Sequence, residues 1–367
     1  MDLYIHDLET LGIKNIIDDY TSLIWTRKYN DVGDFELTAP LSSNNYEALK
    51  LNNIIRKEGD DEGGLIESIE IKQDAKGENT IVVKGRSLSC LLNFRVLYNH
   101  LDYTGTIENL IYKLVYEMLG DKENASHRAI NNFRVITDKN STEEIHRQYM
   151  GDNLGDLVST LVKEKGEGYK VILNVKDKSL DFILYEGIDR SIDQVLNEVV
   201  VFSQEYENIL NLTYYKSSST FCNVAYILGE GEIEEKLTGF SSVDYKNLQR
   251  REIYVDGSSI RRENDEGYTY TRDEYMKLLE DRGLEVLAEN SLIESLEGTL
   301  TPVNTFKYRI DYNLGDIITI VDKKLNLKLN SRIVEVQEVY EGGAESIELT
   351  FGSSVPTIYD KLKKIRS

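Results

Sequence analysis

The side chains that most often carry chemistry are few in this chain, and they are widely spaced. Its four histidines are His6, His100, His127 and His146. None of them is paired at the spacing of a zinc motif such as His-Glu-x-x-His, and no Cys-x-x-Cys occurs. His127 and His146 flank one loop-rich stretch and could meet in space, but two solvated loop histidines are the simpler interpretation. We therefore predict no metal site.

Two acidic clusters could supply paired carboxylates. Asp60, Asp61 and Glu62 are consecutive, as are Glu143 and Glu144. A glycosidase needs two carboxyl groups at a set separation, whereas neighbouring residues of a strand or loop usually diverge. The alternating Asp or Asn residues and central Gly of a calcium loop are also absent. We interpret both clusters as solvated loops.

Signs of a nucleophile or a nucleotide site are equally weak. Gly229 and Gly231 follow a strand as in a dinucleotide loop, but position 234 holds Glu234, whose charge would repel phosphate, so a strand-ending turn is the better interpretation. No Gly-x-Ser-x-Gly elbow or Gly-Lys-Ser/Thr phosphate loop occurs. Cys90 and Cys222 lie in apolar stretches, which predicts buried free thiols. We predict no catalytic, cofactor-binding or metal residues, and a chain that is not an enzyme.

Composition limits the classes of partner. The 43 Lys and Arg residues against 64 Asp and Glu residues give a net charge of -21. This charge argues against specific nucleic-acid binding, because neutralising phosphates requires clustered basic side chains. No apolar run approaches the roughly 20 residues that cross a bilayer, so we expect no membrane insertion. The first residues lack the basic and apolar regions of a secretory signal, so we expect synthesis in the cytoplasm.

The elements that must position these side chains fall into three regions. In residues 1–95, β-rich segments at 21–28 and 34–39 flank a turn at Gly33, and a second pair, 67–72 and 80–84, flanks a turn at 74–77. An antiparallel sheet or small barrel is expected there.

Residues 96–205 have helical periodicity. A helix is predicted after Thr106, with Gly120 as its stop, and another over 153–165, ended by Gly166. Strands follow at 169–175 and 180–185. This region is predicted to be a mixed α+β domain.

In residues 206–355 the β pattern returns around one long helix. Thr271 and Glu274 form a capping box, and an apolar stripe extends the helix to about Glu297, giving a helical insertion at about 271–298. The predicted strands are 208–215, 221–228, 305–311, 317–322, 331–340 and 345–351, with a turn at 216–219 between the first two. Pro40, Pro302 and Pro356 fall at element boundaries, and 356–367 is a C-terminal tail. The predicted fold class is α+β, mainly β, with two tube-like antiparallel β-barrel domains flanking the mixed domain.

Several short segments together resemble a known family. Residues 21–29, Gly33 to Leu37 and Pro40 are similar to the N-terminal signature of tail proteins of long-tailed phages. Three further matches to this family follow in the same order along the chain: 64–69 with 84–88, then 312–316, and finally 334–340 with 349–352. The chain thus resembles the tail hub family of siphophages and phage-tail-like contractile particles. Trp25 and Phe35 are expected to pack the first β core, Gly33 to permit a turn, and Gly315 with Asp316 to form a strand-entry turn.

The resemblance implies a structural role and no catalytic residue. It implies a homotrimer whose six β-barrels continue the hexameric tail tube and join it to tip, spike or baseplate proteins, with the tape-measure protein as a further partner. DNA would pass through the lumen, and the protein would belong to the virion or particle tail tip. A tail-tip receptor-binding protein and a tail-associated cell-wall hydrolase are the alternatives. Flexible-tailed phage, contractile phage and tail-like bacteriocin all remain open.

Overall fold

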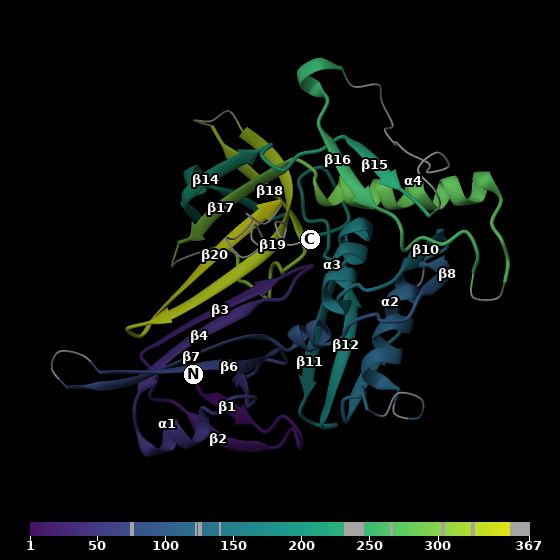
Figure 1. Cartoon of the computed structure of the whole chain (residues 1–367). Helices are drawn as coiled ribbons and strands as arrows, with labels where there is room; N and C mark the ends of the chain where they lie inside the picture. The colour runs from purple at the N-terminus through teal and green to yellow at the C-terminus, as the bar shows by residue number, and fades with distance from the viewer. Residues whose placement is uncertain are drawn as a thin grey trace.

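A computed structural model gives the three-dimensional arrangement of the chain (Figure 1). It describes residues 1–73, 77–121, 123, 127–138, 141–230, 246–264, 267–301, 305–323 and 327–352. Several predictions fall outside these residues. They concern the turn at 74–77, of which only Gly77 is described, Gly231, Glu234, Pro302, Pro356 and the tail at 356–367. Within them, no helix combines the length and apolar character needed to cross a bilayer.

One large, mostly antiparallel sheet runs through both ends of the chain. Its path is β14-β17-β20-β19-β3-β4-β7-β6-β5-β1-β2, and β18 branches from β19 and pairs with β13. In chain order its strands are β1 (Leu3–His6), β2 (Ile13–Ile17), β3 (Ser22–Lys28), β4 (Asp34–Pro40), β5 (Ile54–Lys57), β6 (Gly63–Gln73), β7 (Asn79–Ser87), β13 (Val201–Ser203), β14 (Ile209–Ser217), β17 (Ile293–Leu300), β18 (Ile317–Asp322), β19 (Leu327–Glu341) and β20 (Ala344–Gly352). The mainly β, α+β fold class is confirmed.

The N-terminal and C-terminal β regions meet through β3 and β19. These strands pair antiparallel from Lys28 opposite Glu335 to Ser22 opposite Glu341. We call β3, β4, β7 and β6 the first β unit, and β14, β17, β20 and β19 the second β unit. Because side chains alternate along each strand, one face of the joined sheet is apolar and covers two separate core clusters.

The first core cluster explains the predicted β pattern near the N-terminus. Trp25 and Phe35 stack with ring centroids 5.3 Å apart, and both are buried, as expected. β1, β2 and the short helix α1 (Ser43–Ala48) lie near this core (Figure 1). Gly33 is required in the β3–β4 turn because a Cβ there would lie 2.2 Å from the Thr26 carbonyl oxygen.

The middle region has its own core around two helices. α2 (Ile107–Val115) begins where the Thr106 hydroxyl accepts the Asn109 N–H at 3.3 Å, and a π-helical turn extends it through Tyr116–Gly120. α3 (Leu154–Lys165) is capped by Asn153 and ends at Gly166, whose φ of 71° permits the left-handed cap. The sheets of this region pair β8 (Leu101–Thr106) with β10 (Glu144–Tyr149), and β11 (Gly168–Asn174) with β12 (Ser179–Tyr185), which also pairs with β9 (Phe133–Ile136). Both predicted helices and both predicted strands are confirmed.

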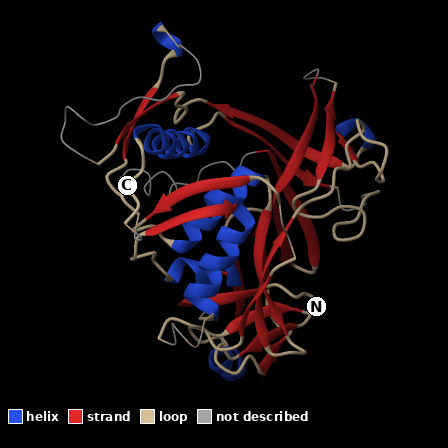
Figure 2. Cartoon of the chain, turned by 90° about the vertical axis from the view of Figure 1, so that its right-hand side faces the viewer, coloured by secondary structure: helices blue, strands red, loops and turns tan. Residues whose placement is uncertain are grey.

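A small arm stands apart from the large sheet in Figures 1 and 2. It consists of the parallel strands β15 (Val224–Leu228) and β16 (Glu252–Asp256) packed on α4 (Arg272–Glu289). The predicted capping box of Thr271 and Glu274 is present. A buried polar joint fixes the arm to β10, because Glu285 accepts hydrogen bonds from the Arg147 guanidinium (2.7 Å) and the Tyr149 hydroxyl (2.6 Å).

Two predictions about this half of the chain are wrong. The helix ends at Glu289, and Ile293–Leu300 forms β17, because backbone pairing with β14 and β20 outweighs the helical spacing of its apolar residues. Residues 305–311 form turns around Tyr308 and Tyr312 instead of a strand. The strands predicted at 208–215 and 221–228 are present as β14 and β15. They lie in different sheets, because β14 pairs with β17 and β15 with β16. Gly315, with φ 94°, and Asp316 directly precede β18, as expected.

Candidate assembly surfaces

The histidines occupy structural positions. His6 lies buried in β1, where its Nδ1 is 3.0 Å from the Leu11 carbonyl oxygen. His127 is exposed in a turn, as predicted, but His146 is a strand residue of β10 whose Nε2 lies 2.8 Å from Asp102. The prediction of a loop histidine at position 146 is therefore wrong, because β8 and β10 pair across this stretch. No three His, Cys, Asp or Glu side chains of the described residues lie close enough to hold a metal ion.

The two cysteines and Gly229 lie in different surroundings. Cys90 is buried, and burial raises its thiol pKa to about 12, which suppresses the reactive thiolate. Cys222 is only half-buried because it lies in the loop between β14 and β15, so the prediction of burial is wrong for it. Gly229 follows the end of β15, where the Glu230 N–H donates to the Tyr275 hydroxyl at 2.6 Å. This geometry agrees with a strand-ending turn.

Asp60 is buried and Glu62 is half-buried, and both form ion pairs, which corrects the prediction of a solvated loop for these two residues. Asp60 forms ion pairs with Arg27 and with Arg309 (2.9 Å), while Glu62 pairs with Arg27 at 3.1 Å. Asp61 is exposed, as predicted, and its carboxylate lies 3.9 Å from the Lys170 ammonium. Glu143 and Glu144 are both exposed, as predicted, but Glu144 begins β10 and is not a loop residue. Asp60 and Glu62 can leave water because basic side chains from distant parts of the chain neutralise them.

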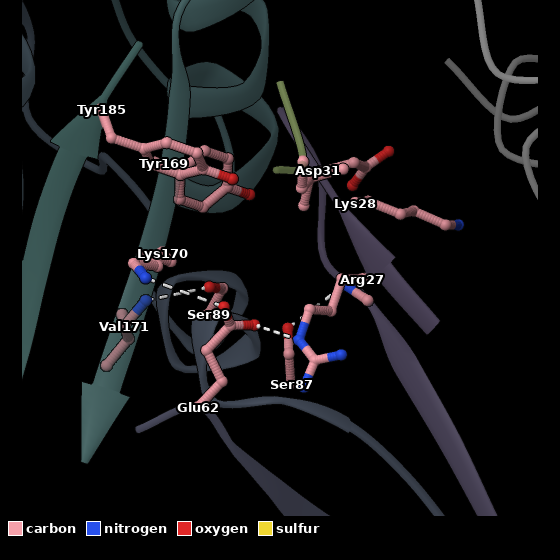
Figure 3. Close-up of a pocket in the computed structure, with 12 residues that line it drawn as sticks. Arg27, Lys28, Asp31, Glu62, Ser87, Ser89, Tyr169, Lys170, Val171 and Tyr185 are labelled. Carbon is pink, nitrogen blue, oxygen red and sulfur yellow. Dashed lines mark hydrogen bonds and ion pairs between the residues drawn. The ribbon is translucent and has the colours of Figure 1, made fainter. Parts of the chain in front are cut away.

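This ion cluster joins the two β units and the middle region. Arg27 of β3 also pairs with Glu338 of β19, and Lys57 of β5 lies 2.8 Å from Glu338. Figure 3 shows Arg27 and Lys170 of β11 on opposite sides of Glu62. The groups are mutually neutralised, so the cluster is suited to fixing strands and not to acid-base catalysis.

Burial and neighbouring charges shift the pKa values of Lys57 and Asp60 in this cluster. Burial and the nearby positive charge of Arg27 lower the pKa of Lys57 to about 6, although Asp60 and Glu62 oppose the shift. Burial opposes ionisation of Asp60, but Arg27, Arg309 and Lys57 together lower its pKa to about 2. Beside the cluster lies a cavity of about 360 Å³, bounded by all three regions through Glu62, Glu186 and Arg309.

Opposite the apolar cores, the large sheet has a polar face. Cross-strand register places Thr26, Asp34 and Gln337 on it, together with the exposed ion pair between Glu36 and Lys84 (2.7 Å). The face's carboxylates are Asp34, Glu36, Glu70, Glu297, Glu335, Glu341 and Glu348, and its basic side chains are Lys28, Lys72, Lys84 and Arg86. We call this surface the polar face. Its carboxylates outnumber its basic side chains.

The two units of the sheet share one topology. In space the first unit runs β3-β4-β7-β6 and the second runs β14-β17-β20-β19. If the four strands of each unit are numbered along the chain, their order across the sheet is first, second, fourth, third in both units. All neighbouring strands within each unit are antiparallel. This repetition makes the chain a tandem of two similar four-stranded units joined through β3 and β19.

Both ends of this eight-stranded run are open among the described residues. β5 pairs only with the start of β6, so Glu67–Gln73 of that strand has β7 on one side alone. β14 pairs with β17 alone. Most side chains of both segments are exposed. Open strand edges of this length are templates for pairing with another chain.

Comparison with known proteins identifies the fold as that of bacteriophage tail proteins. The tail protein from Neisseria meningitidis has TM-score 0.56 at 12% identity, covering 95% of this chain and 96% of that one. The 43 kDa tail protein of prophage MuSo2 from Shewanella oneidensis has TM-score 0.58 at 14% identity, covering 96% and 98%. Prophage tail protein gp18 from Listeria monocytogenes has TM-score 0.53 at 12% identity, covering 100% and 98%.

The chain belongs to the siphovirus ReqiPepy6 Gp37-like protein family, whose model matches residues 2–353. No curated protein sequence matches it. The resemblance to tail proteins of long-tailed phages is thereby confirmed. Its family is a siphovirus family, and its fold is that of phage tail proteins.

Sequence reasoning missed the ion cluster, although a signal was present. Arg27 follows Leu23, Ile24 and Trp25 in one strand, and Lys57 follows Ile54 and Ile55. A single charge inside an apolar strand requires a buried counter-charge. The nearest acidic triplet, 60–62, was the available partner.

Proposed function

We propose that three copies of the chain form a ring that serves as the hub at the tip end of a phage tail tube. The observation that carries the proposal is the run of eight antiparallel strands with open edges at β6 and β14. Because eight is even, the two edge strands run in opposite directions, so β14 of one copy meets β6 of the next in antiparallel pairing. Such a head-to-tail contact closes into a ring when the rotation permits.

The repeated unit explains how a trimer fits a hexameric tube. Each copy supplies two four-stranded units of one topology, so three copies supply six. The proposed domain limits follow from this division: 1–95 and 206–355 hold the tube-like β-barrels, and 96–205 holds the mixed domain. The mixed domain and the arm then stay outside the ring, available to tip, spike or baseplate proteins. The protein acts without catalysis, in the tail of the virion or tail-like particle.

In this ring the polar face lines the lumen. Its excess of carboxylates repels the phosphates of passing DNA, as well as any acidic segment of the tape-measure protein. A triple variant, Glu36→Lys with Glu297→Lys and Glu348→Lys, is expected to retain duplex DNA in a filter assay at low salt, whereas the unmodified ring does not. DNA binding by the unmodified ring would contradict an acidic lumen.

Disulfide trapping tests the ring. Glu70→Cys in β6 is combined with Thr213→Cys or Tyr215→Cys in β14, in a Cys222→Ser background, so that a disulfide forms only where strands of two copies lie about 5.5–6 Å apart at Cα. The proposal predicts covalent trimers for at least one register. Ile13→Cys in β2 replaces the β14 cysteine as a control that should not cross-link to β6. The absence of cross-linking in every register would overturn the ring.

A further inference from the structure

A loop between the middle region and β13 exposes two large aliphatic side chains. Val195 and Leu196 are 95% and 90% exposed, more than any other apolar side chain of the described residues except Leu248. Asp193 and Glu198 flank them in sequence. We call residues 188–199 the apolar knuckle. Leaving two such side chains in water forgoes about 1.5–3 kcal/mol of burial for each, so a surface of this kind indicates a binding partner.

Hydrogen bonds within the knuckle fix its shape before any partner arrives. The Gln194 side chain accepts from the N–H groups of Leu196 (2.7 Å) and Asn197 (2.8 Å), and it donates to the Ser191 carbonyl (3.0 Å). The Asn197 amide donates to the Asp189 carbonyl at 2.9 Å. A loop held in this way loses little conformational entropy when it binds.

The knuckle is also anchored to the second β unit. Asn330 of β19 donates to Asp193 at 2.6 Å, and Asp189 forms a β-bridge with Ile317 at the start of β18. Its exposed tip therefore projects from the half of the chain that carries the open edge of β14.

A complementary surface lies on the other half. Phe94 and Tyr98 are exposed, and Arg86 and Arg128 stack over their rings at 6.0 and 5.0 Å. Arg95 lies beside Arg128, and each donates to main-chain carbonyl groups. We call Phe94, Arg95, Tyr98 and Arg128 the basic patch.

The charge of the basic patch is not compensated within the described chain. Neither Arg95 nor Arg128 forms an ion pair with a described carboxylate. Burial lowers the pKa of Arg95, and the nearby positive charge of Arg128 lowers it further. Two uncompensated arginines beside exposed aromatic rings, on a chain of net charge -21, favour an acidic and apolar partner.

We propose that the apolar knuckle of one copy docks onto the basic patch of the next copy, with Val195 and Leu196 against the rings of Phe94 and Tyr98. Asp193 and Glu198 then face Arg95 and Arg128. This inference rests on the proposed ring and adds a second contact at the same junction. The ring brings the second β unit of one copy against β6 of the next, and the patch adjoins β6 because Arg86 stacks over Phe94 and pairs with Glu67 (2.6 Å).

The contact also resolves an electrostatic problem. Copies that each carry -21 repel one another, so association requires local attraction between opposite charges. An acidic knuckle that meets a basic patch supplies this attraction and selects one relative orientation. The contact is therefore expected to weaken as ionic strength rises.

Cysteine pairing across copies tests this contact. One preparation of the full chain carries Leu196→Cys and another carries Tyr98→Cys, both with Cys222→Ser. Mixing the two under mild oxidation is expected to give a covalent dimer, while neither preparation alone gives one. Leu51→Cys, which replaces another exposed leucine (54%), is the control in place of Leu196→Cys and should not cross-link.

The result for the knuckle contact can be told apart from the result for the ring. The Glu70→Cys scan against β14 reports edge pairing independently of the knuckle. Edge cross-linking without Leu196–Tyr98 cross-linking overturns the knuckle contact and leaves the ring standing. Absence of both overturns both. As a second readout, Val195→Ser with Leu196→Ser should raise the concentration at which half the chains assemble at least tenfold, and an unchanged concentration would contradict the contact.

Discussion

Arg27 of β3 and Glu338 of β19 form an ion pair that is buried where the two β units join. Asp60 and Glu62 pair with the same guanidinium. Replacing Arg27 with Met leaves three carboxylates around an uncharged side chain. We expect the variant to lose about 3–5 kcal/mol of unfolding free energy, because the carboxylates lose the positive charge that they share and keep only the weaker pairs with Lys57, Arg309 and Lys170. Urea unfolding measures the change.

Lys28→Met is the matched control for Arg27→Met. Lys28 is the next residue of β3, but it lies on the polar face and faces Glu335 across the β3–β19 pair. Its loss should change the unfolding free energy by under about 1 kcal/mol. Equal losses for the two variants would show that the buried cluster does not stabilise the junction.

Lys57 should make stability depend on pH. Its pKa falls from 10.5 unfolded to about 6 folded, so between these values the unfolded chain binds the extra proton. The unfolding free energy attributable to this group therefore rises with pH across the window, by at most about 1.4 kcal/mol per pH unit. Comparing wild type with Lys57→Met at several pH values between 6.5 and 9 isolates the slope. Parallel curves for the two proteins would contradict the lowered pKa.

Gly85→Ala should disrupt the pairing of β6 with β7. A Cβ at this position would lie 1.8 Å from the Leu65 carbonyl oxygen, so the backbone must move. We expect a loss of about 1–3 kcal/mol or more in thermal or urea unfolding. Gly12→Ala is the control because its Cβ would meet only the Thr10 hydroxyl at 3.5 Å. A Gly85→Ala variant as stable as Gly12→Ala would contradict the close packing of the strands.

The arm should loosen when its helix cap is removed. Thr271→Ala deletes the hydroxyl that accepts the Glu274 N–H, which should lower local stability by about 1 kcal/mol. Hydrogen exchange at the start of α4 is then expected to speed up about fivefold. Exchange in β3 and β4 should stay unchanged, and an equal increase there would show that the arm and the sheet unfold together.

Local patterns in the sequence predicted most single elements but not their partners. The caps at Thr106 and Thr271, the helical spacing of 153–165 and the alternation of 34–39 were sufficient, because helix starts and half-buried strands are encoded by near neighbours. Ile293 to Leu300 was misassigned because three apolar residues at helical spacing also suit a strand. Only the distant strands β14 and β20 decide between the two structures.

The buried ion pairs between residues that are far apart along the chain were not predicted from the sequence. Asp60 was interpreted as solvated because its counter-charges, Arg27 and Arg309, are 33 and 249 residues away. The joint between β3 and β19 was hidden for the same reason. The candidate surfaces depend on that joint, because it makes eight strands continuous and leaves the edges at β6 and β14.

The most direct test of the central claim is particle imaging of the purified full-length protein, with the images averaged without imposed symmetry. The account predicts closed rings of three copies, each contributing two β units around a central hole, with the middle region and the arm outside. Isolated single copies across the accessible concentration range, or rings with another number of copies, would contradict it.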